Sequence, residues 1–337
     1  MISVVRQSAL VAMFMALIHG VCILVASTQI PADVPNYAYR CNQNIMAAPQ
    51  IVEYLLFYRR AFAKPGPKLI LLGSSNVGFG LQAKEIEELL PGTTVFSLCM
   101  GSANITQLRE IVDLVFEDLP RSEFKNTTII LGQAYNIFID DKARWGGADT
   151  QLDQIKLNFF GLFHHDRTGK VVSVLPASVM HIAGILLLPN RWLARIANVG
   201  GEVWNAKAIV PMLYRDRDDR VDVMNKAWFT VFGNSPVLKD EQFVRLVDLV
   251  QSVTNKGSRF VVVDMPNPRW HKATSTHFAD YQSRKVGLIR LIESIPNAHY
   301  INMQDLDDDS IFYDATHVLP EDTYLLSDKL VKELHKL

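Results

Sequence analysis

Short apolar segments of strand length alternate with amphipathic segments along most of the chain. The strand-length segments are found at residues 68–72, 94–98, 127–131, 259–264 and 298–303. Segments with apolar residues at helical spacing follow them, at residues 82–90, 106–119, 241–254, 276–294 and 320–337. A strand that is followed by a helix usually pairs in parallel with a neighbouring strand, because the helix carries the chain back along the sheet. The pattern therefore predicts the α/β class, with a parallel sheet covered on both faces.

The alternation stops over residues 139–235. This stretch has no strand–helix repeat of its own, so we interpret it as an insertion rather than an independent domain. Its longest apolar run, at 171–188, is interrupted by Pro176 and His181, and the uninterrupted remainder is too short to cross a bilayer. A short buried or interface helix is expected there. The charged block at 215–222 alternates in sign and is expected to be a solvated face.

The longest uncharged apolar segment lies near the start of the chain, at residues 9–26. A helix of this length spans most of a hydrocarbon core of about 30 Å. Arg6 precedes the segment and Asp33 is the first charge after it, which favours an orientation with the N-terminus inside. A cleaved signal peptide is the alternative, although its apolar region is usually only about 7–15 residues long. We expect an uncleaved anchor, and either alternative exports the rest of the chain.

These patterns divide the chain into three parts. Residues 1–28 are the expected membrane anchor, and residues 29–66 are an extracytoplasmic linker with a helix. Lys64-Pro-Gly-Pro67 ends that helix. The main domain follows over residues 67–337 and contains the insertion at 139–235.

Charge and cysteine content narrow the possible partners. The chain has 34 Lys and Arg against 35 Asp and Glu, so no basic field is available for a nucleic acid. Of its three cysteines, Cys22 lies in the expected anchor. Cys41 and Cys99 either pair in an oxidising compartment or remain separate thiols.

The sequence shows no metal-site spacing. His164 and His165 have no acidic or thiol partner at ligand spacing, so a solvated loop is expected for them. Residues 305–309 are rich in aspartate but lack the twelve-residue calcium loop, which favours a solvated acidic turn. We expect neither a metal nor a cofactor.

Residues that can carry chemistry follow the predicted strands. Ligands of an open parallel sheet bind outside the carboxyl ends of its strands. The segments found there are 73–76 after the first strand, 100–104 after the second, 132–136 after the third, 266–268 after the fourth and 312–317 after the last. They contain Ser74, Ser75, Gly101, Gln133, Asn136, Asp314 and His317. A glycine and two serines alone usually form a helix-capping turn. Together, however, these residues supply a serine nucleophile, a histidine base, an orienting carboxylate, and backbone N–H donors at Ser75 and Gly101 for an oxyanion.

This ordered set of blocks resembles the SGNH (GDSL-like) hydrolase superfamily over residues 68–337, without the insertion. The resemblance implies a three-layer α/β fold, with Ser75 as nucleophile and Asp314 and His317 completing the triad. Two positions depart from the family pattern. Ser74 stands where an aspartate is common, and Ala134 replaces the asparagine of the third block. Gln133 or Asn136 would then have to be the side-chain donor to the oxyanion, or no side chain donates.

The Leu-Gly-Ser-Ser75 block, the anchor and the insertion together resemble a membrane-tethered branch of that superfamily. This branch includes proteins of alginate and cellulose O-acetylation and of teichoic-acid D-alanylation. The resemblance implies a single-pass protein of the cytoplasmic membrane with a periplasmic or extracytoplasmic serine O-acyltransferase domain. A multi-pass membrane O-acyltransferase would supply the acyl group, and an envelope or secreted polysaccharide would accept it. Two alternatives stay open, a polysaccharide O-acetyl esterase of the same fold and an inactive scaffold that docks the membrane acyltransferase.

Overall fold

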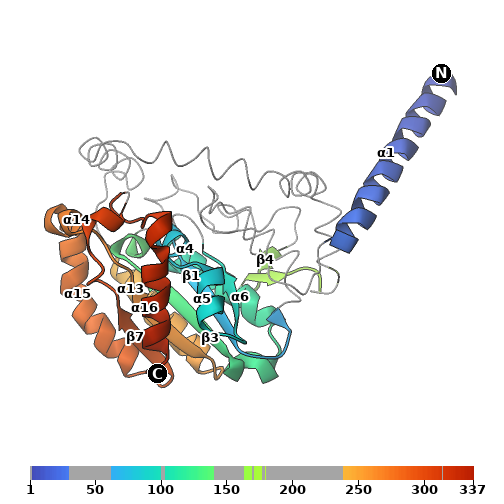
Figure 1. Ribbon diagram of the computed structural model, residues 1–337. Helices are drawn as coiled ribbons and strands as arrows, with labels where there is room; N and C mark the ends of the chain where they lie inside the picture. The colour runs from blue at the N-terminus through green and yellow to red at the C-terminus, as the bar shows by residue number, and fades with distance from the viewer. Residues whose placement is uncertain are drawn as a thin grey trace.

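A five-stranded parallel sheet forms the centre of the computed structural model (Figure 1). The structure describes residues 2–29, 62–99, 103–139, 163–168, 171–176, 179, 238–312 and 314–337. The strand order is β2-β1-β3-β6-β7, for β1 (Lys68–Gly73), β2 (Thr94–Ser97), β3 (Thr127–Gln133), β6 (Arg259–Asp264) and β7 (Ala298–Asn302). Every neighbouring pair is parallel. The predicted α/β class with a parallel sheet is confirmed.

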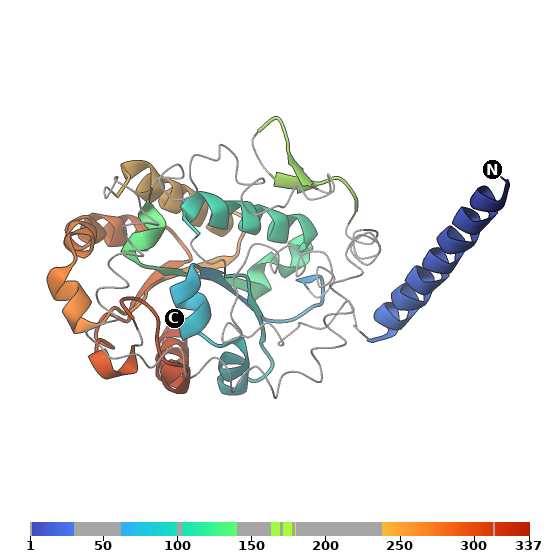
Figure 2. The same ribbon diagram turned by 90° about the horizontal axis from the view of Figure 1, so that it is seen from above.

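Helices cover both faces of the sheet, as the view from above shows (Figure 2). In β1, Ile70 and Leu72 belong to one apolar core, and Leu69 and Leu71 belong to the other. The helices that complete the first core are α6 (Ile105–Asp118), α13 (Asp240–Thr254) and α15 (Thr276–Glu293). Those that complete the second are α4 (Ser75–Gly80), α5 (Ala83–Leu89) and α16 (Thr323–Leu334). Because both faces are buried, the central strands are continuous apolar runs, which made them recognisable in the sequence.

The strands and long helices lie within a few residues of their predicted ends. The closing segment begins with a 3₁₀ turn, Pro320–Asp322, before α16. Two helices were not predicted, α4 and α14 (Arg269–Thr274), which have six residues each. Six residues make fewer than two helical turns, so no apolar periodicity can develop in them.

Part of the interrupted stretch is an antiparallel pair of short strands, β4 (Phe163–His165) and β5 (Val171–Ser173). The loop predicted for His164 and His165 is therefore wrong, since both residues lie in β4. The helix predicted over 171–188 is also wrong for its first residues, which form β5; beyond Pro176 only Val179 of that run is described. Three residues per strand are too few to show alternation in the sequence.

The described parts of the insertion pack on the main domain. The hydroxyl of Ser173 donates to the Glu117 carboxylate of α6 at 2.7 Å, and Leu175 packs against the core. Ile139 and Leu238 pair in an antiparallel bridge, so the chain leaves and re-enters the domain at one place. The division of the chain into one domain with an insertion at 139–235 stays a prediction.

The N-terminal segment is one long apolar helix, α1 (Ile2–Gln29), which stands apart from the sheet in Figure 1. Its window Val4–Val21 has a mean hydropathy of 1.6 and none of it is buried. Within the described residues, α1 alone is long and apolar enough to cross a membrane. A signal sequence shares these properties, so the anchor stays a prediction.

Several expectations fall on residues outside the described ranges. They are the linker helix before Pro67 apart from Phe62, the charged block at 215–222, and Cys41. The other cysteine of the possible pair, Cys99, is buried, with its sulfur 3.8 Å from the carbonyl oxygen of Leu71.

Candidate active site

Two glycines shape the turn that carries Ser75. β1 ends at Gly73, and its neighbour in the register of β3 is Gly132. A Cβ atom at Gly73 would lie 2.2 Å from Val77 Cγ2, and one at Gly132 would lie 2.3 Å from the same atom. Gly73 also has a φ of +155°, a conformation that L side chains rarely adopt. The two glycines therefore let Val77 seat the first turn of α4 directly on the sheet, which places Ser75 at the carboxyl ends of β1 and β3.

Replacing Gly132 by Ala is expected to lower the free energy of unfolding by about 1–3 kcal/mol, because the new methyl group overpacks against Val77. The new methyl group should also displace α4. Val77→Ala in the same chain should recover part of the lost stability. Gly287→Ala is the control, since no atom lies within 4 Å of the added Cβ on α15. Urea unfolding of the three variants and the wild type measures the effect, and a Gly132→Ala protein as stable as the wild type would contradict this role.

Ser75, His317 and Asp314 form a continuous hydrogen-bonded chain. His317 Nε2 lies 2.8 Å from Ser75 Oγ, and His317 Nδ1 lies 2.6 Å from Asp314 Oδ2. Ser75 and His317 are both half-buried, whereas Asp314 is buried. The structure thus brings Ser75, which follows the first strand in the sequence, together with Asp314 and His317, which come after the last strand. Such an arrangement can transfer the serine proton to the imidazole while the serine oxygen attacks an acyl carbon.

Asp314 is held as a carboxylate. Burial acts to raise its pKa, but the neighbouring His317 and several hydrogen bonds together lower the pKa below its ordinary value. Its Oδ1 accepts the backbone N–H groups of Thr316 and His317, each at 2.8 Å. Because a carboxylate only accepts hydrogen bonds, Nδ1 of His317 must carry the proton, and Nε2 is left as the acceptor for the Ser75 hydroxyl.

Phe79 is a neighbour of the triad that the sequence analysis missed. Its ring meets the His317 imidazole edge-on, with ring centroids 5.0 Å apart. Phe79 follows Ser75 by four residues in α4, so both side chains lie on the same side of the helix. That spacing was visible in the sequence, but it has meaning only once the segment is known to be helical.

The structure distinguishes the predicted oxyanion donors by their position. Asn136 lies beside the turn that carries Ser75, where its Nδ2 donates to Ser74 Oγ at 3.2 Å. Gln133 does not lie there: its Nε2 donates to the Tyr281 hydroxyl of α15 at 2.8 Å, and its side chain is fully buried. Gly101 lies outside the described residues, and the backbone N–H of Ser75 opens α4.

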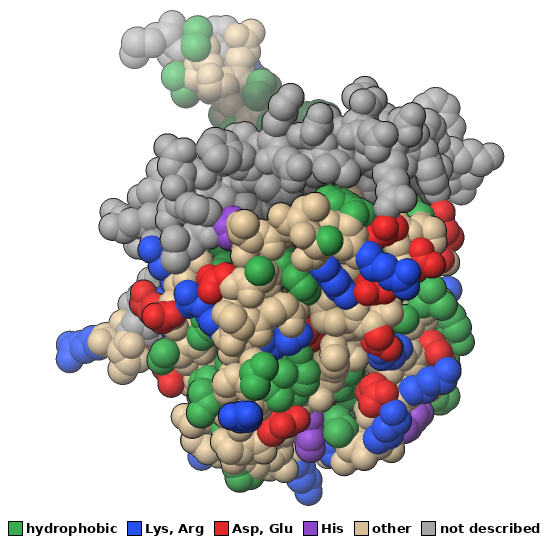
Figure 3. All heavy atoms as spheres, turned by 90° about the vertical axis from the view of Figure 1, so that its left-hand side faces the viewer, with side chains coloured by type: hydrophobic (Ala, Val, Ile, Leu, Met, Phe, Trp, Pro, Cys, Tyr) green, Lys and Arg blue, Asp and Glu red, His purple; other side chains and the backbone are tan. Residues whose placement is uncertain are grey.

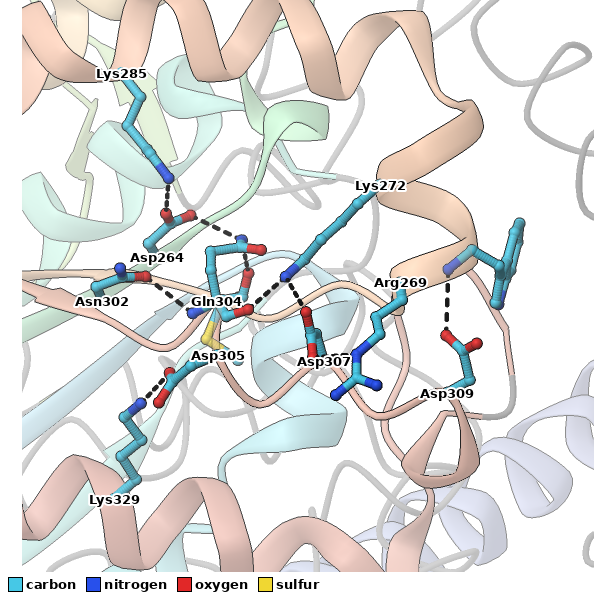
Figure 4. Close-up of polar contacts among 12 residues, drawn as sticks. Asp264, Arg269, Lys272, Lys285, Asn302, Gln304, Asp305, Asp307, Asp309 and Lys329 are labelled. Carbon is cyan, nitrogen blue, oxygen red and sulfur yellow. Dashed lines mark hydrogen bonds and ion pairs between the residues drawn. The ribbon is translucent and has the colours of Figure 1, made fainter.

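Gln133 belongs to a buried network centred on Asp264. The Asp264 carboxylate accepts hydrogen bonds from Lys285 at 2.7 Å, Tyr281 at 2.7 Å and Tyr300 at 2.8 Å. Gln304 Nε2 donates to the same group at 3.1 Å (Figure 4). A charge without access to water needs this number of partners. The network joins β6, α15, β7 and the segment after β7.

The acidic turn at 305–309 is paired with basic side chains rather than simply solvated, as Figure 4 shows. Asp307 binds Arg269 at 2.8 Å and Lys272 at 3.1 Å, both from α14. Asp305 pairs with Lys329 of α16. These contacts fix the segment that leads to Asp314 and His317. Charges of both signs are interspersed over the described part of the face seen in Figure 3.

A second histidine, His271 of α14, lies buried close to the triad. Its Nε2 lies 2.8 Å from the Tyr135 hydroxyl. Burial lowers the pKa of His271 to about 4, with His277 acting in the same direction and Asp314 opposing it. Burial, reinforced by the charge of Asp314, raises the pKa of Tyr135. Both groups are therefore neutral at pH 7.

The neutral His271 predicts an acid-sensitive stability. The unfolded chain takes up this proton near its ordinary pKa of 6.5, whereas the folded chain does so only near pH 4. Stability is therefore full above pH 6.5 and falls by up to about 3 kcal/mol as the pH drops through this window. In His271→Gln, urea unfolding between pH 7 and 4 should show a smaller loss. His335→Gln, at the exposed end of α16, is the control, and an unchanged pH slope in His271→Gln would contradict the assignment.

No model of a known protein family and no curated protein matches the chain. Among solved structures, the chain is similar to one described as "The structure of a putative platelet activating factor from Streptococcus pneumonia". The two are 11% identical, the match covers 85% of this chain and 92% of the other, and the TM-score is 0.43. A similarity of this size assigns no activity to the chain. What the chain shows by itself is a parallel α/β fold with a Ser–His–Asp hydrogen-bonded chain at the carboxyl ends of its strands.

Proposed function

We propose that the chain is an SGNH-type serine acyltransferase that forms an acyl-enzyme on Ser75. The observation that carries this proposal is the contact chain from Ser75 Oγ to His317 at 2.8 Å and on to Asp314 at 2.6 Å. Ser75 and His317 are 242 positions apart in sequence, so the fold is needed to join them. A contact of this length favours an enzyme over an inactive docking scaffold.

The reaction proceeds in two half-reactions. Ser75 Oγ attacks the acyl carbon of the donor ester while its proton moves to His317 Nε2. The resulting oxyanion accepts hydrogen bonds from the backbone N–H of Ser75 and from Asn136 Nδ2, with Gly101 as a further donor. His317 then protonates the leaving alcohol, which leaves the acyl group on Ser75. In the second half-reaction His317 takes the proton of an acceptor hydroxyl, whose oxygen attacks the acyl carbon. His317 then returns this proton to Ser75 Oγ as the bond between Oγ and the acyl carbon breaks.

We propose that the acceptor is an envelope or secreted polysaccharide, and that a multi-pass membrane O-acyltransferase supplies the acyl group. The length and apolar character of α1 support a location at the cytoplasmic membrane, with the domain on its outer side. The resemblance of the Leu-Gly-Ser-Ser75 block, the anchor and the insertion to the membrane-tethered branch supports transfer to a sugar hydroxyl.

The location is tested with a reporter fused to the C-terminus after Leu337. A reporter that is active only after export should be active, because the domain follows a single apolar helix. Activity of a cytoplasm-only reporter would contradict the proposed location.

The reaction products distinguish acyl transfer to a sugar from hydrolysis of the ester. The full-length chain in detergent is incubated with a chromogenic acetyl ester, with and without cello- or alginate-oligosaccharides. Transfer predicts O-acetylated oligosaccharide, which mass spectrometry detects and which is absent with Ser75→Ala. An O-acetyl esterase would release only acetate, because water would be its acceptor. A docking scaffold would give neither product and no labelling by a fluorophosphonate.

A further inference from the structure

Ser74 is the N-cap residue directly before α4, but its side chain does not form the usual capping hydrogen bond. A serine at this position usually accepts a hydrogen bond from a backbone N–H of the first turn through its side chain. Here no side-chain cap bond forms, although the backbone carbonyl of Ser74 accepts the N–H groups of Val77 and Gly78, each at 3.2 Å, as the carbonyl of an N-cap residue does. The hydroxyl of Ser74 is thereby available for other partners.

Those partners are two asparagines, one directly after Ser75 in the chain and one after β3. Ser74 Oγ donates to Asn76 Oδ1 at 2.6 Å and accepts from Asn136 Nδ2 at 3.2 Å. All three side chains are at most 2% exposed, so water does not replace these bonds. Ser74 and Asn76 follow β1, whereas Asn136 follows β3, the adjacent strand. The hydroxyl therefore joins the segments that follow β1 and β3, the first of which contains Ser75.

The hydroxyl also selects the orientation of the Asn136 amide. A serine hydroxyl has a single hydrogen. Because that hydrogen is directed at Asn76, the oxygen can only accept from Asn136, and it therefore faces the amide nitrogen instead of the amide oxygen. An amide turned the other way would present a partial negative charge to the site, which would repel an oxyanion.

We infer that Ser74 is a positioning residue, whose hydroxyl holds the Asn136 amide nitrogen toward the turn that carries Ser75. This inference rests on the proposed function, since it concerns the side-chain donor of the same reaction. It also connects the two departures from the superfamily pattern: the serine that replaces the common aspartate contacts the asparagine that lies two positions after Ala134.

The test is a double-mutant cycle on kcat and KM for an acetyl ester. Ser74→Ala should lower kcat by about tenfold to a hundredfold, somewhat less than the loss of an oxyanion donor itself, with KM nearly unchanged. Ser74→Cys, which preserves the packing but bonds weakly, should fall between Ala and the wild type. In an Asn136→Ala background, Ser74→Ala should change kcat by less than about twofold, because the residue on which it acts is already absent.

Ser258→Ala is the matched control. Ser258 is a fully buried serine whose hydroxyl bonds the carbonyl of Phe124 at 2.7 Å, before the start of β6 and so at the opposite edge of the sheet. This variant should lose stability without losing kcat. Equal losses from Ser74→Ala in both backgrounds, or a wild-type kcat in Ser74→Ala and Ser74→Cys, would overturn the inference. Retained activity of Ser75→Ala would instead contradict the proposed function itself.

Discussion

Replacing Ser75 by Ala is expected to lower kcat for ester cleavage by about 10⁴-fold to 10⁶-fold, as the loss of a triad nucleophile does in other serine enzymes. In the proposed mechanism the attacking atom is the hydroxyl oxygen that lies 2.8 Å from His317 Nε2, and no other atom of the triad could replace it. Covalent labelling by a fluorophosphonate should disappear at the same time. Initial rates and in-gel fluorescence measure the two effects.

Stability should hardly change in this variant, because Ser75 is half-buried and supports little packing. Ser283→Ala, on the exposed side of α15, is the control and should retain both turnover and labelling. Undiminished labelling of Ser75→Ala would mean that another residue is the nucleophile.

The second large effect is expected from Asp314→Asn, with a loss of about 10⁴-fold in kcat near neutral pH. The amide oxygen of the new side chain can still accept the backbone N–H groups of Thr316 and His317, so the loop should keep its shape. Its amide N–H₂, however, would face Nδ1 of His317. Nδ1 would then become the acceptor and Nε2 would carry the proton, which leaves no base for Ser75.

Two comparisons make this prediction specific. Asp305→Asn, on the acidic turn that pairs with Lys329, should retain activity, since its side chain is largely exposed and its partner belongs to α16. In a Ser75→Ala background, Asp314→Asn should cost nothing further, because residues of one catalytic unit are not additive. A loss of tenfold or less in Asp314→Asn would contradict its role in orienting His317.

The sheet could be predicted from sequence because its strands are buried on both faces. Such strands are uninterrupted apolar runs, and β6 begins and ends at the predicted residues. The rule that ligands lie at the carboxyl ends of parallel strands then selected five segments, and the resemblance to the SGNH superfamily assigned the triad to Ser75, Asp314 and His317 within them. The structure places these three residues in contact, whereas their catalytic roles stay a proposal.

The positions of Gln133 and Asn136 depended on side-chain direction. Residues two apart in a strand face the same side, so Gln133 shares the side of Leu131, which belongs to the core beneath α15. That periodicity was a usable signal, and it explains why Gln133 meets Tyr281 rather than the triad. Asn136 lies beyond the end of β3, where the alternation no longer applies.

Other features need contacts between distant segments and leave no local signal. The Tyr135–His271 pair joins residues 136 positions apart, and the Arg269–Asp307 pair joins residues 38 apart. The strands β4 and β5 are too short for their alternation to be recognised. In each case the position of a residue depends on its partner in the structure, and the residue's own local sequence does not reveal that partner.

Peptide mapping by mass spectrometry tests most directly whether an acyl-enzyme forms on Ser75. The full-length chain is mixed with an acetyl ester, quenched in acid within seconds and digested. The account predicts that the peptide containing Ser75 gains the mass of one acetyl group, that fragmentation places this group on Ser75, and that the adduct is absent in Ser75→Ala and strongly reduced in His317→Ala. Ester turnover with no adduct on Ser75, or with an adduct on another residue, would contradict it.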